Sequence, residues 1–142
     1  MKNLFKVFLI GFTLNSCTPF NISDDCRDEL NRYVNFEGKY EEQPNEGVIF
    51  SNYNVLDKAG DCEDFATTKV LFLKKYCPNY SSAYLLTFYS NLHNIGHAVL
   101  VVDGQVLDNR SLFTYPLNDL EIKYQPSIKR KYDIHTEKLL TP

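Results

Sequence analysis

The chain has 142 residues, 44% of them hydrophobic and 14% aromatic, with a formal net charge of -3 at pH 7. This length suits one domain, and this composition excludes an intrinsically disordered chain. The acidic balance argues against a nucleic-acid-binding protein, and the basic run at 129–131 fits a solvated strand end. We therefore expect one globular domain, residues 17–142, that acts as a monomer.

The first sixteen residues differ from the rest of the chain. Two lysines precede an apolar run that is too short to span a bilayer as a helix, so residues 1–16 predict a signal peptide. The sequence LNSC, which ends at Cys17, resembles a bacterial lipobox, in which the cysteine is lipidated and becomes the first mature residue. We expect export to a bacterial cell envelope, either to the periplasm or to a membrane through a lipidated Cys17. An uncleaved apolar anchor is the alternative.

Residues 24–36 predict an amphipathic helix. Ser23 suits its N-cap, and the two aspartates that follow suit its first turn. Apolar residues then recur at helical spacing on one face, namely Cys26, Leu30, Tyr33 and Val34. The polar stretch at 37–46 predicts a loop, and residues 48–56 fit no single element.

The stretch AGDCEDFA, residues 59–66, predicts the start of a second helix. Asp61 suits the N-cap, and Asp64 three residues later completes a capping box. Apolar residues continue at helical spacing, and Pro78 ends the helix. Cys62 therefore occupies the first helical position, among three carboxylates.

Strands dominate the remainder of the chain. Residues 82–89 are rich in β-branched and aromatic side chains and predict a strand. The runs 97–102 and 105–108 predict an antiparallel hairpin, because Asp103-Gly104 between two apolar runs is a strong two-residue turn signal. Residues 122–134 predict one or two further strands. The fold class is therefore α+β, with N-terminal helices packed on an antiparallel sheet.

The turn length decides which side chains of the hairpin share a face. With a two-residue turn, Val102 pairs with Gln105 and Val99 lies opposite Asp108. His97 and Asp108 are then diagonal neighbours on one face, with backbones roughly 7–8 Å apart, so that the carboxylate can reach the imidazole. A three-residue turn would move Asp108 to the opposite face.

Cys62 has four interpretations: a nucleophile, half of a disulfide, a metal ligand or a small buried residue. A helix N-terminus favours a thiolate through its dipole and its unpaired N–H groups, which suits a nucleophile. We hypothesise that Asp108 orients His97, that His97 takes the thiol proton, and that Cys62 attacks a carbonyl carbon. The Cys62 backbone N–H is a candidate oxyanion donor. The alternative is a buried structural cysteine among acidic capping residues.

The remaining cysteines suggest one disulfide. Fifteen helical residues would place Cys62 and Cys77 roughly 22 Å apart, which is beyond disulfide reach. If Cys17 is lipidated and Cys62 is catalytic, Cys26 and Cys77 remain as a candidate bridge, which an exported protein permits.

His93 and His97 have the H-x₃-H spacing of some zinc ligands. Gly96 and the strand start at His97 break the helical spacing that such a pair needs, and the two nearest cysteines lie too far apart. We therefore do not expect a zinc site.

Three motifs follow one another along the chain: GDCEDFA at 60–66, GHAVL at 96–100 and LDNR at 107–110. This order resembles the bacterial transglutaminase-like cysteine proteinases, the family of a periplasmic protease that clips surface adhesins. The resemblance covers about residues 30–125. It implies a transglutaminase-like, papain-like fold and a catalytic triad formed by Cys62, His97 and Asp108.

The resemblance also implies a calcium site beside the nucleophile, although the chemistry itself needs no cofactor. The family's acidic ligands correspond to Asp61 and Glu63 here, with Asp64 as a third candidate, and oxygen ligands suit this hard cation. Calcium would also offset the carboxylates, which otherwise oppose a thiolate. The chain departs from the family in having no tryptophan, where members carry a Tyr-Trp pair before the glycines.

These features together predict an exported cysteine peptidase that hydrolyses a peptide or amide bond through a thioester. A transglutaminase or other acyl transferase on the same fold is one alternative, because water and an amine attack the same thioester. A non-catalytic envelope lipoprotein that keeps the fold as a binding module is the other.

Overall fold

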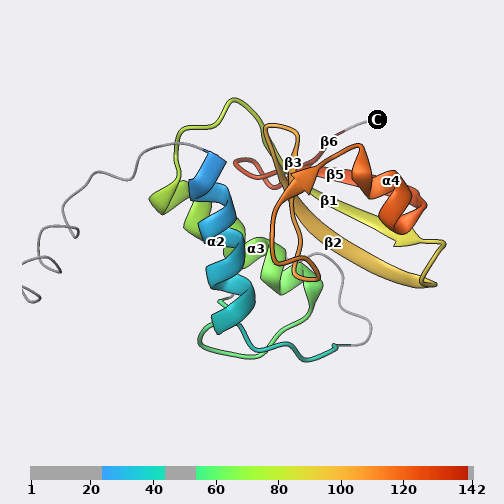
Figure 1. Ribbon diagram of the computed structural model, residues 1–142, viewed down its shortest axis with the longest axis horizontal. Helices are drawn as coiled ribbons and strands as arrows, with labels where there is room; N and C mark the ends of the chain where they lie inside the picture. The colour runs from blue at the N-terminus through green and yellow to red at the C-terminus, as the bar shows by residue number, and fades with distance from the viewer. Residues whose placement is uncertain (1–23, 44–53, 141–142) are drawn as a thin grey trace, which may run out of the picture.

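The computed structural model describes residues 24–43 and 54–140. Helices α2 (Asp24–Glu37) and α3 (Cys62–Tyr76) pack on one face of an antiparallel sheet, and the short helix α4 (Asp119–Tyr124) packs on the other face (Figure 1). The predicted α+β class is confirmed. The helix predicted at 24–36 ends one residue later than expected.

The sheet has six strands in the order β4-β3-β2-β1-β5-β6, and every neighbouring pair is antiparallel. The strands are β1 (Ala83–Ser90), β2 (Ile95–Val102), β3 (Gln105–Leu107), β4 (Tyr115–Pro116), β5 (Pro126–Asp133) and β6 (Leu139–Leu140). The two central strands are long, whereas β3 covers only the turn end of β2. At the other end of β2, that edge has no strand beside it among the described residues, and the start of helix α3 contacts β2 there.

Alternate residues of the central strands point into two separate apolar layers. The layer beneath α2 and α3 includes Leu30, Val34, Phe65, Leu73, Leu100 and Leu107. The layer beneath α4 includes Leu86, Phe88, Val99, Val101, Leu120 and Tyr124. The hairpin of β2 and β3 is therefore buried on both faces, which holds the residues at its ends in place.

The start of α3 is fixed by the predicted capping box. Asp61 Oδ1 accepts a hydrogen bond from the Glu63 N–H at 3.1 Å, and Asp64 Oδ2 accepts one from the Asp61 N–H at 3.1 Å. A Cβ atom at Gly60 would lie 2.4 Å from Asp64 Oδ2, so this position requires glycine. Together these contacts place Cys62 at the first residue of the helix, as predicted.

The hairpin has the predicted register, with Val102 opposite Gln105 and Leu100 opposite Leu107. Asp103 and Gly104 have φ angles of 48° and 79°, which is the left-handed backbone of a two-residue primed turn. Asp103 Oδ1 also accepts the Ser82 N–H at 2.8 Å, which pins the turn to the start of β1.

The prediction of one or two strands within 122–134 is confirmed by β5, which begins only at Pro126. Residues 122–124 belong to α4, where Leu120 and Tyr124 lie four residues apart and are both buried. That i, i+4 spacing places both side chains on one helical face. Strand β2 also begins at Ile95, two residues before the predicted start.

Cys26 and Cys77 form the disulfide that the sequence left as a candidate, with their Cα atoms 6.2 Å apart. It ties the first turn of α2 to the C-cap of α3, and Cys62 is the free cysteine of the described residues. The predicted signal peptide at 1–16 and Cys17 lie outside those residues. Within them, no helix has the length and apolar character needed to cross a membrane.

Candidate active site

His97 and Asp108 meet as the hairpin register predicts. His97 Nε2 lies 2.9 Å from Asp108 Oδ1, and both side chains are almost completely buried. A carboxylate can only accept a hydrogen bond, so Nε2 carries the imidazole proton and Nδ1 presents its lone pair. Nδ1 is buried and has no hydrogen-bond partner among the described residues. The imidazole is therefore oriented at one nitrogen and able to accept a proton at the other.

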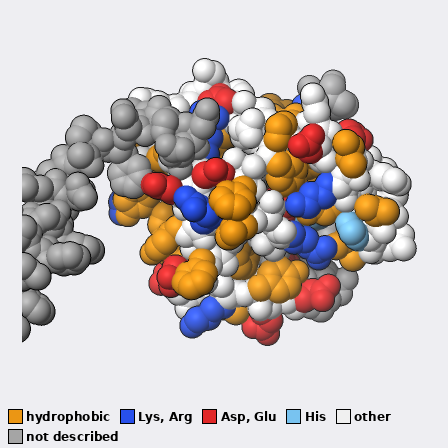
Figure 2. Space-filling view, viewed as in Figure 1, with side chains coloured by type: hydrophobic (Ala, Val, Ile, Leu, Met, Phe, Trp, Pro, Cys, Tyr) orange, Lys and Arg blue, Asp and Glu red, His pale blue; other side chains and the backbone are white. Residues whose placement is uncertain are grey.

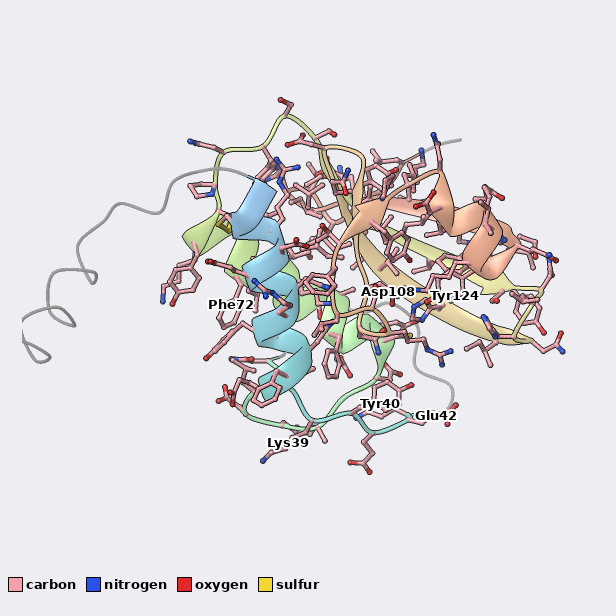
Figure 3. The ribbon with its side chains drawn as sticks, viewed as in Figure 1. Lys39, Tyr40, Glu42, Phe72, Asp108 and Tyr124 are labelled. Carbon is pink, nitrogen blue, oxygen red and sulfur yellow. A yellow bond between two sulfur atoms is a disulfide. The ribbon has the colours of Figure 1, made fainter. Side chains whose placement is uncertain are left out.

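Two tyrosine hydroxyls hold the other oxygen of Asp108. Tyr124 donates to Oδ2 at 2.6 Å and Tyr115 donates to the same atom at 2.8 Å, while the Arg110 N–H donates to Oδ1 at 2.9 Å. Figure 3 shows Asp108 and Tyr124 side by side. Burial alone would raise the pKa of Asp108, but the His97 contact, the Tyr124 hydroxyl and the Arg110 N–H hold it below its usual value. Asp108 is therefore charged at neutral pH.

The imidazole of His97 is also held by aromatic packing. Its ring centroid lies 5.1 Å from that of Tyr124 and 5.5 Å from that of Phe88, which meets it edge-on. Tyr124 therefore contacts both members of the pair, with its ring against His97 and its hydroxyl on Asp108. Such packing leaves the imidazole little freedom to rotate away from the carboxylate.

The backbone that carries Asp108 is clamped by helix α2. Asn35 Nδ2 donates to the carbonyl oxygens of Asp108 at 2.8 Å and Ser111 at 2.9 Å. Asn31 Nδ2 donates to the Ser111 carbonyl at 2.9 Å, and Asn31 Oδ1 accepts from Lys69 Nζ at 2.7 Å. These contacts fix the chain directly after β3, where its pairing with the neighbouring strands has ended.

Lys69 is a fully buried lysine in the middle of α3. Burial lowers its pKa to about 7, and the nearby negative charge of Asp108 opposes that change. A buried ammonium is costly without partners, so its bond to Asn31 and the field of Asp108 both support this position. The lysine thus joins α3 to the clamp that holds the Asp108 backbone.

Cys62 reaches the edge of β2 that β3 leaves uncovered. Cys62 packs against the small apolar cluster of Ala66, Leu85 and Ala98, and its thiol interacts with the backbone N–H of Ala98, the residue after His97. Cys62 and His97 also line one pocket of about 430 Å³. The structure therefore gathers all three predicted triad residues at one end of the sheet.

The electrostatics of Cys62 differ from the expectation of a favoured thiolate. Burial, followed by the charge of Asp61, raises the pKa of Cys62 to about 12, and Glu63 adds to this rise. The Ala98 N–H opposes it. Burial and these two carboxylates therefore outweigh the favourable end of the helix dipole, and the group is a neutral thiol at pH 7.

Two walls of different character enclose the pocket. One wall comes from the 40–43 segment and the start of α3 and carries three carboxylates, those of Glu42, Asp61 and Glu63. The other comes from β1, β2 and β5 and includes Tyr89, Ile128 and Arg130. A pocket of this volume and shape can hold a peptide segment between the thiol and the sheet.

The metal-site prediction stays a prediction. Among residues 24–43 and 54–140, no group of three or more His, Cys, Asp or Glu side chains is placed to hold a metal ion. Asp61 and Glu63 are close together, but Asp64 is used by the capping box. His93 lies with Nε2 at 3.3 Å from the Lys123 carbonyl oxygen, away from a zinc arrangement.

Neither a protein-family model nor a curated protein matches the sequence. The fold does have solved counterparts. Calcium-bound LapG from Legionella pneumophila matches with a TM-score of 0.60 at 22% identity, covering 80% of this chain and 65% of that one. The EGTA-treated form of LapG matches with a TM-score of 0.58 at 21% identity, covering 75% and 61%. The chain shares the fold of LapG.

This likeness concerns the fold alone, because the identity is low and the chain spans 65% of the length of that LapG structure. One of these LapG structures is calcium-bound, and the other is EGTA-treated. What LapG does therefore bears on this chain only as support for a proposal.

Sequence reasoning missed the residues that support the pair of His97 and Asp108. Tyr115 and Tyr124 follow the hairpin in the chain, and the i, i+4 spacing of Leu120 and Tyr124 could have indicated a helix that returns over it. Asn31 and Asn35 have the same spacing on α2, which could have indicated one polar function. Nothing in the sequence marks Lys69 as buried.

Proposed function

We propose that this chain is an exported cysteine peptidase that hydrolyses a peptide or amide bond through Cys62, His97 and Asp108. One observation carries the proposal. The buried His97 is hydrogen-bonded to Asp108 through Nε2, its Nδ1 has no hydrogen-bond partner among the described residues, and it lines the same pocket as Cys62. The shared fold of LapG and the resemblance of the three sequence motifs to the transglutaminase-like cysteine proteinases both support this reaction class.

In the first half of the reaction, Cys62 Sγ attacks the substrate carbonyl carbon while its proton passes to His97 Nδ1. Since the thiol is neutral at pH 7, proton transfer to the imidazole accompanies attack. The charged Asp108 stabilises the resulting imidazolium. The Cys62 backbone N–H, at the free end of α3, is a donor for the oxyanion that forms on the carbonyl oxygen.

In the second half, His97 returns the proton to the departing amine, which leaves a thioester on Cys62. Water then loses a proton to Nδ1 and attacks the thioester, which releases a carboxylic acid and restores the thiol. An amine in place of water would give a new amide instead. That product is the transferase alternative that the same residues allow.

The disulfide supports the proposed location. Disulfides such as Cys26–Cys77 persist in oxidising compartments and are rare in the cytosol. Export to the periplasm, or attachment to an envelope membrane through a lipidated Cys17, fits this bridge. Acidic and basic side chains are interspersed on the face shown in Figure 2, which fits a protein or peptide substrate better than nucleic acid. We further propose that the domain acts as a monomer.

Reactivity of Cys62 tests the proposal without knowledge of the substrate. Iodoacetamide at pH 7 is expected to alkylate Cys62 of the wild type, and His97→Ala is expected to slow the reaction about tenfold or more by removing the proton acceptor. Mass spectrometry of the labelled peptide measures the rate, with the exposed His135→Ala variant as control. An inert Cys62, or equal rates in the two variants, would leave the binding-module alternative in its place.

The product separates a peptidase from a transferase. The wild type is incubated with a library of internally quenched peptides, and separately with a glutamine donor and a labelled amine. Cleavage without incorporation of the amine is expected. Incorporation without cleavage would instead assign the chain to the acyl transferases.

Calcium binding at Asp61 and Glu63 remains part of this proposal. Their carboxylate oxygens suit calcium, and their charges raise the pKa of Cys62, so a site beside the nucleophile has the right donor chemistry. Bound calcium would offset those charges. The described residues add no third His, Cys, Asp or Glu, so further ligands would be other oxygen atoms or water.

We predict that millimolar calcium raises the melting temperature of the wild type and that EGTA reverses the rise, because a ligand that binds only the folded state stabilises it. The double variant Asp61→Asn/Glu63→Gln should lose the shift but still fold, since asparagine also caps helices well. Differential scanning calorimetry measures the effect, with magnesium as the matched cation. A shift that persists in the double variant, or none in the wild type, would remove this site.

Tyr124→Phe is predicted to lower kcat about 10- to 100-fold with little change in KM, because it removes a hydrogen bond to the charged Asp108 and retains the ring against His97. Tyr84→Phe removes a hydroxyl from a tyrosine packed on the same apolar layer and serves as control. Equal kinetics for the two variants would show that the Tyr124 hydroxyl has no part in orienting Asp108.

A further inference from the structure

Strand β5 contains a bulge at the pocket. Thr87 of β1 pairs with Arg130 and Tyr89 pairs with Ser127, so one residue of β1 lies opposite two of β5. The residue of β1 at this point is Phe88, whose ring packs edge-on against His97. Bulges next to active sites change the direction in which a side chain points. Here the two residues of β5 that lie opposite Phe88 are Ile128 and the residue that follows it.

Ile128 adopts an unfavourable backbone conformation. Its φ angle is 52°, in the left-handed region that β-branched residues rarely enter. The other non-glycine residues with positive φ in the described part of the chain are Asn94, Asp103, Gln125 and Glu137, none of which is β-branched. Strain of this kind persists where the surrounding structure imposes it, and such sites concentrate at ligand-binding surfaces.

Burial in the core does not explain the isoleucine. Its side chain is 70% exposed, so it contributes little to the apolar layers of the fold. It lines the same pocket as Cys62 and His97, on the sheet wall that also contains Tyr89. An apolar side chain is thus held, at a cost in backbone strain, on the wall that faces the thiol.

We propose that Ile128 is a specificity-determining residue, which contacts an apolar side chain of the peptide substrate next to the bond that is cleaved. This inference rests on the proposed peptidase function and names its substrate class. Contact between two apolar side chains removes both from water, which strengthens binding of such peptides over polar ones. Arg130 adds a cation to the same wall, so a substrate carboxylate is the competing occupant.

The test uses internally quenched peptides in which one position at a time carries leucine, serine, lysine or aspartate. The wild type is expected to prefer leucine over serine about tenfold in kcat/KM at one position beside the cleaved bond. Ile128→Gly and Ile128→Asn should lose that preference. Leu139→Gly, which removes an exposed apolar side chain from β6 outside the pocket, should keep it.

The melting temperature separates this role from a structural one. Glycine and asparagine adopt positive φ readily, so neither Ile128 variant should melt below the wild type. Lost preference with unreduced melting temperature supports the inference. Wild-type cleavage with an unchanged leucine preference in both variants, or with a preference for aspartate, would overturn the inference and leave the peptidase intact. Absence of cleavage together with an inert Cys62 would overturn both.

Discussion

Asp108→Asn is expected to lower kcat/KM about 10³- to 10⁴-fold, the largest effect among the substitutions considered. The carboxylate stabilises the imidazolium that forms when His97 takes the thiol proton, and a neutral amide cannot supply that charge. The amide also turns an N–H₂ group toward donors, since Asp108 accepts bonds from Tyr115, Tyr124 and the Arg110 backbone. Both effects act on the orientation and basicity of His97.

The measurement is the initial rate on a cleaved library peptide, at several substrate concentrations so that kcat and KM separate. Asp119→Asn, at an exposed aspartate in the first turn of α4, is the matched control and should retain wild-type rates. Melting temperatures of both variants show whether the buried amide also weakens the fold. A loss of less than about tenfold in Asp108→Asn would mean that His97 needs no carboxylate, and the triad would have to be abandoned.

The position of Asp108 could be predicted because it depends on local chemistry. Asp103-Gly104 accepts the left-handed backbone of a two-residue turn, and once the turn length is known, the alternation of side chains places His97 and Asp108 on one face. The capping box likewise sets the first residue of α3 through neighbours three positions apart. Both features are encoded within a few residues, so no knowledge of distant contacts was needed.

The groups that support Asp108 could not be predicted in this way, because their contacts join residues far apart in the chain. Asn35 reaches the Asp108 carbonyl across 73 positions, and Lys69 reaches Asn31 across 38. The side chain of a lysine within a helix is normally expected to be exposed to solvent. Only the packing of α2 and α3 against the sheet shows that it is buried beside the loop that follows β3.

The protonation state of Cys62 depended on magnitudes that the sequence does not provide. Its place at a helix N-terminus predicts a lowered pKa, whereas burial and two neighbouring carboxylates raise the pKa to about 12. The direction of the carboxylate effect was foreseeable from GDCEDFA, but the larger effect of burial follows from the packing of Cys62 against the sheet. The nucleophile is therefore expected to depend on His97 more strongly than a preformed thiolate would.

The double variant Cys26→Ala/Cys77→Ala is expected to lose about 4 kcal/mol of unfolding free energy. The bridge joins residues 51 positions apart, and closing a loop of that length in the unfolded chain reduces its entropy by an amount that corresponds to this value. It also fixes α2 against α3, and these helices carry Asn35 and Cys62. Loosening them should lower activity through the position of the Asp108 loop relative to the thiol.

Urea unfolding followed by circular dichroism measures the change. Cys62→Ala keeps the bridge and is the matched control, with an unfolding midpoint close to that of the wild type. Reductant should move the midpoints of the wild type and of Cys62→Ala to that of the double variant, and it should leave the double variant unchanged. If reductant moved none of the midpoints, the bridge would not stabilise the fold. The clamp on Asp108 would then depend on the packing of α2 and α3 alone.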